Sequence, residues 1–161
     1  MSIPNKNNRG FTLIEVLVSL AILTIAIIPA LYLSNSAANV GFAVRDNFIA
    51  AGLAQEGIEV VRAIRDTNWF NGRDFDSGLA DGSYRLEWDS TSLLALGANP
   101  PLNIDDGLYT YGSGTPSVFS RSITITKVNT GELKVVSTVT WQTRTNDTKT
   151  VSAEDHLFDW K

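Results

Sequence analysis

The sequence predicts an α+β fold, in which one long N-terminal helix packs on a small antiparallel β-sheet. Apolar residues dominate an uncharged stretch at positions 16–44 and then recur every three or four positions to Ile64, which is the period of a helix. After position 82, short alternating segments are separated by turn residues, which is typical of strands. We therefore expect three parts: a basic leader at 1–10, the apolar half of the helix at 11–39, and an α+β domain at 40–161.

The composition excludes several kinds of functional site. The chain has no cysteine and one histidine, His156, so disulfides, thiolate zinc sites and multi-histidine metal sites are excluded. A net charge of −4 leaves no basic surface for nucleic-acid binding. No phosphate-binding glycine loop or hydrolase nucleophile motif is present, and Asp155-His156 would need a serine positioned against it to form a triad. We therefore expect no enzyme and no specific nucleic-acid partner.

Residues 11–33 are long enough to cross a membrane as a helix. At about 1.5 Å per residue they span roughly 34 Å, and the apolar core of a bilayer is about 30 Å thick. Lys6 and Arg9 precede this segment without any acidic residue, which favours a cytoplasmic N-terminus and an exported C-terminal part. A secretory signal cut near Ser34-Asn35-Ser36, a plain signal anchor and a more specialised export signal all fit this pattern.

Two residues are unusual in this apolar segment. A carboxylate such as that of Glu15 costs up to about 2.5–3.5 kcal/mol at mid-membrane and usually has a function, unless it lies shallow enough for water to reach it. Pro29 removes one backbone hydrogen bond, so we expect a kink in the helix at this position.

Residues 9–23, RGFTLIEVLVSLAIL, closely resemble the N-terminal signal of type IV pilins and type II secretion pseudopilins. In that family, prepilin peptidase cuts after the glycine that ends the leader and then methylates the new N-terminus. The resemblance implies cleavage between Gly10 and Phe11 and N-methylation of Phe11. It also implies an assembly role for Glu15, whose carboxylate would pair with the Phe11 amine of a neighbouring subunit. Glu15 lies one helical turn after Phe11, so both project from the same face.

The resemblance further implies partners and a location. The partners would be other pilin or pseudopilin subunits, prepilin peptidase, an inner-membrane platform protein and an assembly ATPase, with membrane lipid around the helix before assembly. The chain would first be a single-pass protein of the cytoplasmic (inner) membrane, with a cytoplasmic N-terminus and an exported C-terminal domain. It would then join a pilus or pseudopilus at the cell surface or in the periplasm. The amino-acid sequence of the signal and a short sheet that ends near Asp159-Trp160 resemble those of minor, initiating or tip subunits more than those of major subunits.

A second class of function stays open, because only the N-terminal third carries the resemblance. The chain would then be a membrane-anchored or secreted binding domain, such as an adhesin, that uses its N-terminus only for export. The absence of a cysteine pair separates it from disulfide-bearing major pilins.

The second half of the helix is expected to continue to about Arg65, where Asp66-Thr67-Asn68 and Gly72 predict its end. Its expected buried stripe consists of Val40, Val44, Phe48, Ala51, Ala54, Ile58, Val61 and Ile64. Gly41, Gly52 and Gly57 weaken this half by about 1 kcal/mol each. They serve either to let the helix loosen during assembly, as in pilin-like filaments, or to let it pack closely on the sheet.

The remaining residues predict several strands and turns. Residues 83–88 alternate, with Tyr84, Leu86 and Trp88 on one face, whereas proline and glycine in 97–116 predict a loop. A hairpin turn at Asn129-Thr130-Gly131 joins two further strands, and 148–153 could be the last. Their expected inward residues are Phe119, Ile123 and Ile125, then Leu133, Val135, Val139 and Trp141, with Ser137 as an interruption. Phe158 and Trp160 would cap the core or face a neighbour.

Five aspartates are candidates for calcium binding: Asp74, Asp76 and Asp81 in one cluster, and Asp105 and Asp106 in another. Oxygen-rich loops suit Ca²⁺, and some major pseudopilins bind it near their C-terminal end. The spacing does not fit an EF-hand, however, and solvated Asp-Gly turns account for such residues equally well. We therefore expect no cofactor, with calcium as the one candidate.

Overall fold

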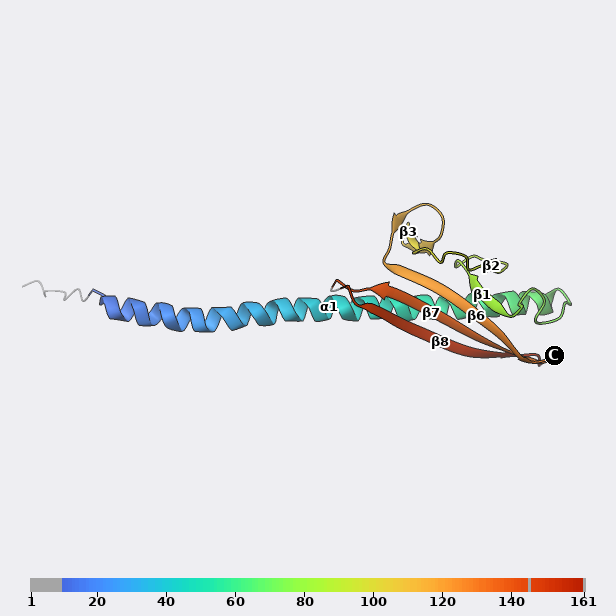
Figure 1. The fold of residues 1–161 in the computed structure, drawn as a ribbon, viewed down its shortest axis with the longest axis horizontal. Helices are drawn as coiled ribbons and strands as arrows, with labels where there is room; N and C mark the ends of the chain where they lie inside the picture. Colours follow the sequence, from blue (N-terminus) through green and yellow to red (C-terminus); the bar gives the residue numbers. More distant parts are fainter. Residues whose placement is uncertain (1–9, 145, 161) are drawn as a thin grey trace, which may run out of the picture. The chain divides into compact units, whose positions relative to one another are not determined.

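The computed structural model describes residues 10–144 and 146–160, so the predicted leader lies outside the described residues except for Gly10. One helix, α1 (Leu13–Phe70), precedes all the strands, which confirms the α+β class (Figure 1). The strands are β1 (Gly82–Arg85), β2 (Leu94–Ala95), β3 (Asn103–Asp105), β4 (Leu108–Thr110), β5 (Thr115–Pro116), β6 (Phe119–Asn129), β7 (Glu132–Gln142) and β8 (Thr148–Phe158). The chain divides into two compact units, Met1–Phe42 and Ala43–Lys161, which are described separately.

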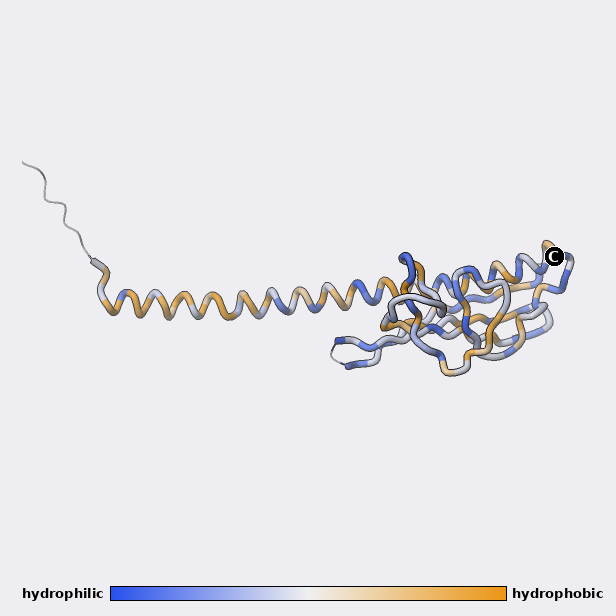
Figure 2. Tube along the Cα trace, turned by 90° about the horizontal axis from the view of Figure 1, so that it is seen from above, coloured by the Kyte–Doolittle hydropathy of each residue, from blue (hydrophilic) through white to orange (hydrophobic). Residues whose placement is uncertain are grey.

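The first unit contains the apolar half of α1. Every described residue up to Gly41 is exposed, although most are leucine, isoleucine, valine or alanine (Figure 2). Within the described part of the chain, α1 is the one helix long and apolar enough to cross a membrane. The α-helix continues through Pro29, and the kink there stays a prediction. Such a surface requires lipid or other protein around it.

The second unit is built on a five-stranded antiparallel sheet with the order β2-β1-β6-β7-β8. β6, β7 and β8 have 11 residues each and run beside the second half of α1 (Figure 1). The predicted last strand is therefore longer than 148–153. Residues 97–116, predicted to be loop, hold a second antiparallel sheet with the order β4-β3-β5. Its strands have only two or three residues, so they carry too little alternation to be seen in the sequence.

The core lies between α1 and the sheet and confirms only part of the predicted stripe. Ala54, Ile58, Val61 and Ile64 are buried, and so are all the predicted inward residues of β6 and β7. Val40, Val44 and Phe48 are exposed instead, with Phe48 at 75%, because the buried face of α1 begins only at Ala50.

Gly57 is the point where α1 approaches the sheet most tightly among its glycines. A Cβ atom at this position would lie 2.5 Å from Ile123 Cδ1 and 2.5 Å from Ser137 Oγ. Ser137, predicted to interrupt the inward face of β7, therefore occupies the space opposite a glycine, where a larger side chain would collide with the helix. At Gly41 and Gly52, an added Cβ atom would meet no atom within 4 Å, so close packing explains Gly57 alone.

Arg121 joins three segments from inside the core. Its side chain is 0% exposed and points inward from β6, between Phe119 and Ile123. Nη1 donates to Leu53 O (3.0 Å) and to Glu56 Oε1 (2.7 Å) on α1, and Nη2 donates to Leu86 O (2.5 Å). A buried guanidinium is tolerated only when it is paired and hydrogen-bonded, so these contacts fix α1 against the sheet.

The helix extends five residues beyond the predicted end at Arg65. It ends in a Schellman motif, in which Arg73 N donates to Asn68 O and Gly72 N donates to Trp69 O. Gly72 has a φ of 67°, the left-handed conformation that the motif requires and that glycine adopts without strain. The Asn68 amide also donates to Ser77 O, which attaches the following loop to the helix.

Three aromatic residues near the sheet are exposed at the surface: Trp88, Phe158 and Trp160. Trp88 is 49% exposed, whereas Leu86, which also follows the end of β1 at Arg85, is buried, so the predicted alternation does not extend to Trp88. Trp160 is 68% exposed and lies edge-on against Trp69, with ring centroids 4.6 Å apart. Phe158 is half exposed and stacks on His156, so neither C-terminal aromatic residue caps the core.

Substituting Gly57→Ala is expected to lower the free energy of unfolding by about 1–3 kcal/mol, because the added methyl group overpacks the contact with β6 and β7. Gly52→Ala is the matched control on an open face of the same helix, and it should raise stability by about 1 kcal/mol. Chemical denaturation of the full chain in detergent micelles, followed by tryptophan fluorescence, measures both. Equal stability of the two variants would contradict the close approach.

Candidate functional site

The first turn of α1 is closed by a capping box. Thr12 precedes the first helical residue, and Glu15 N donates to Thr12 Oγ1 (3.3 Å). In return, Thr12 N donates to Glu15 Oε2 (3.5 Å), so each residue satisfies an N–H group that the helix leaves free. Both distances are long for hydrogen bonds, which makes this a loose box.

The capping box gives Glu15 a role within its own chain. A carboxylate in the first turn interacts favourably with the positive end of the helix dipole. The Thr-x-x-Glu spacing of a capping box is visible in the sequence. This cap is missed when Glu15 is considered only as a group that pairs with another subunit. The carboxylate is exposed in the isolated chain, so it stays accessible to a second partner.

Gly10 and Phe11 lie before the helix and are exposed. The peptide bond between them is therefore outside the helical hydrogen-bond ladder, which begins at the Val16 N to Thr12 O bond. The bond is thus exposed and free of helical hydrogen bonds. Gly10, Phe11 and Glu15 thus lie together at one end of the first unit.

The calcium candidates are divided between two parts of the fold. Lys127 bonds to both Asp76 and Asp81, through its ammonium group and its backbone N–H respectively. The Asp76 carboxylate raises the pKa of Lys127 above its ordinary value. Asp105 and Asp106 lie at the β3–β4 turn, where Asp105 accepts a hydrogen bond from Ser113. Among the described residues, no group of three or more histidine, cysteine or acidic side chains is placed to hold a metal.

Asp155 and His156 point in different directions from β8. Asp155 Oδ2 accepts a hydrogen bond from Arg62 Nη2 on α1 (2.7 Å). His156 Nδ1 lies 2.7 Å from Glu132 Oε1 on β7. Each side chain is thus engaged in a contact that holds β8 to its neighbours.

Substituting Thr12→Val is expected to fray the first turn of α1, because it removes the hydroxyl that caps the helix and costs about 1 kcal/mol. Backbone ¹³C chemical shifts of residues 13–15 in detergent micelles should move toward random-coil values. Thr12→Ser keeps the hydroxyl and should leave those shifts in place. Unchanged shifts in the valine variant would show that the cap contributes nothing.

Comparison with known families bears on this end of the chain. The family model described as the prokaryotic N-terminal methylation motif matches residues 5–31, which include Gly10, Phe11 and Glu15. No curated protein and no solved structure matches the chain. The motif covers the residues before α1 and the first part of α1, and it leaves the sheet outside it. The chain therefore carries the N-terminal signal of type IV pilin-like and pseudopilin subunits.

Proposed function

We propose that the chain is a structural subunit of a type IV pilus or a type II secretion pseudopilus. Prepilin peptidase cuts it between Gly10 and Phe11 and methylates Phe11, and the subunit then assembles through the first half of α1. The observation that carries this proposal is the methylation motif placed directly on an apolar helix with an accessible carboxylate in its first turn. We also propose a minor, initiating or tip position, which is supported by the resemblance of the signal alone.

The exposed apolar surface of the first unit supports assembly through α1. Residues 13–41 are all exposed and mostly apolar, so this segment of the helix needs an apolar environment. Membrane lipid supplies it before assembly, and the helices of other subunits replace the lipid in a filament. Van der Waals packing between such helices, together with the few polar groups that they carry, then decides how the subunits fit.

Glu15 supports a fixed register between subunits. Cleavage would create a cationic amine at Phe11, and a carboxylate buried in an apolar bundle is costly unless an opposite charge pairs with it. The capping box holds one Glu15 oxygen near the helix start, and the amine of a neighbour would pair with the same group. Subunits shifted by one turn would leave both charges unpaired.

The rest of the proposal follows from this role. The subunit does no catalysis, needs no cofactor, and enters the cytoplasmic (inner) membrane with its N-terminus in the cytoplasm and its second unit exported. Its partners are other pilin-like subunits, prepilin peptidase, the platform protein and the assembly ATPase.

The variant Glu15→Gln separates the two roles of this residue. Glutamine still accepts the Thr12 N–H in a capping box, but it has no charge to offer a neighbour. We expect normal expression and leader removal, with incorporation into filaments reduced about tenfold or more, because the loss of one partner of a buried ion pair costs about 3–5 kcal/mol. Immunoblotting of the membrane and filament fractions measures this.

Two further outcomes sharpen the test. Thr12→Val, which weakens the cap and keeps the charge, should be incorporated much better than Glu15→Gln. If Glu15→Gln enters filaments at the normal level, the charge pairing is wrong and the cap accounts for Glu15. If the unaltered chain enters no filament and remains a processed membrane protein, the anchored binding domain replaces the filament subunit.

A further inference from the structure

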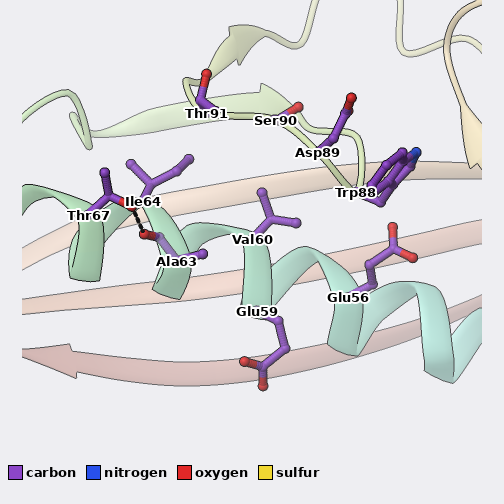
Figure 3. Close-up of a pocket in the computed structure, with 10 residues that line it drawn as sticks. All are labelled: Glu56, Glu59, Val60, Ala63, Ile64, Thr67, Trp88, Asp89, Ser90 and Thr91. Carbon is purple, nitrogen blue, oxygen red and sulfur yellow. Dashed lines mark hydrogen bonds between the residues drawn. The ribbon is translucent and has the colours of Figure 1, made fainter.

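A groove of about 450 Å³ lies between the second half of α1 and the loop that follows β1. Val60, Ala63 and Ile64 line it on the helix side, and Trp88 forms one wall (Figure 3). Val60 and Ile64 point from α1 toward the loop, where Ser90 and Thr91 form the opposite edge (Figure 3). The groove lies entirely within the second unit, on the surface of the isolated chain.

The charged residues that line this groove are all acidic: Glu56, Glu59 and Asp89. Glu56 is directed toward Trp88 (Figure 3). One oxygen of Glu56 accepts from Arg121 and one oxygen of Glu59 accepts from Arg62. Asp89 makes no hydrogen bond or ion pair with any other residue that the structure describes. Figure 3 shows the Glu59 side chain directed away from the loop. The lining thus offers an apolar floor, an aromatic wall and the carboxylates of Glu56 and Asp89.

A basic side chain matches all three features. The aliphatic stem of arginine or lysine covers apolar surface while its charged end stays at the rim. A guanidinium also stacks on the face of tryptophan, and it binds carboxylates through several donors. Among the described residues, Arg65 lies over the Trp69 ring at 4.6 Å and Arg85 lies over the Tyr111 ring at 5.3 Å, so such stacking already occurs in this fold. The Trp88 ring is 49% exposed, and among the described residues no cation lies over it.

We propose that this groove binds an arginine or lysine side chain from an adjacent filament subunit. The inference rests on the proposed function, since the partner is a neighbour in the filament. The side chain lies along Val60, Ala63 and Ile64, and its charge lies between Trp88 and Asp89. The groove therefore adds a contact between second units to the contacts that the apolar helices make.

Accessibility of a cysteine at the groove edge tests whether a neighbour covers it. The chain has no cysteine of its own, so Thr91→Cys introduces a single thiol at the groove. A bulky, membrane-impermeant maleimide is applied to the detergent-extracted chain and to isolated filaments. We expect Thr91→Cys to react about tenfold more slowly in filaments, as a groove about nine-tenths occupied requires. Ser113→Cys, on an exposed segment outside the groove, should react at the same rate in both states.

The sign of the charge tests which side chain occupies the groove. Asp89→Lys, combined with Thr91→Cys, should expel a basic side chain and restore fast labelling in filaments. Asp89→Glu keeps the charge and should keep the protection. Asp106→Lys reverses an exposed aspartate at the β3–β4 turn and should have no effect on labelling of Thr91→Cys.

Two results would overturn the proposal. Fast labelling of Thr91→Cys in normal filaments would show that the groove stays open, although the chain is still a filament subunit. Protection that survives Asp89→Lys would show that the occupant is not a basic side chain. Absence of the chain from filaments would instead contradict the proposed function, so the two failures can be told apart.

Discussion

The close approach of α1 to the sheet at Gly57 is the constraint on which the second unit depends. The missing side chain lets Ile123 and Ser137 lie against the helix backbone. One position earlier, Glu56 forms an ion pair with the buried Arg121. The Arg121 guanidinium also donates to the backbone carbonyl groups of Leu53 on α1 and of Leu86 after β1. A buried charge is costly to leave unpaired, so the helix cannot rotate or slide without losing these bonds. This contact therefore decides which residues of α1 face the core and which line the groove beside Trp88.

The same helix meets a different requirement in the first unit, where every described residue up to Gly41 is exposed. The Glu15 carboxylate lies in the first turn of α1, where the capping box and the helix dipole both favour a negative charge. Glu15 is therefore satisfied within one chain and still accessible to a second, as the proposed change from a single membrane protein to a filament subunit requires.

The sequence predicts those features that depend on periodicity, and it misses those that depend on contacts between distant residues. The helix and the inward faces of β6 and β7 follow from spacing alone. Arg121 occupies an inward position of β6, but its charge argues against burial until Glu56 and two carbonyl groups are known to surround it. The small polar side chain of Ser137 at an inward position is explained only by its close contact with Gly57 on the helix. The exposure of Phe48 depends on where the sheet ends along the helix. The Thr-x-x-Glu cap could have been read from the sequence, whereas the groove could not, because a loop far along the chain forms one of its walls.

The intact mass and N-terminal sequence of the chain purified from membranes test the proposed processing and assembly route most directly. We expect a chain that begins at Phe11 and carries one methyl group on its terminal amine. That result would establish the prepilin route and leave the identity of the filament to be found. A chain that begins near Ala37 would instead indicate ordinary secretion, and an intact chain that begins at Met1 would indicate a simple membrane anchor; either would contradict the proposed function.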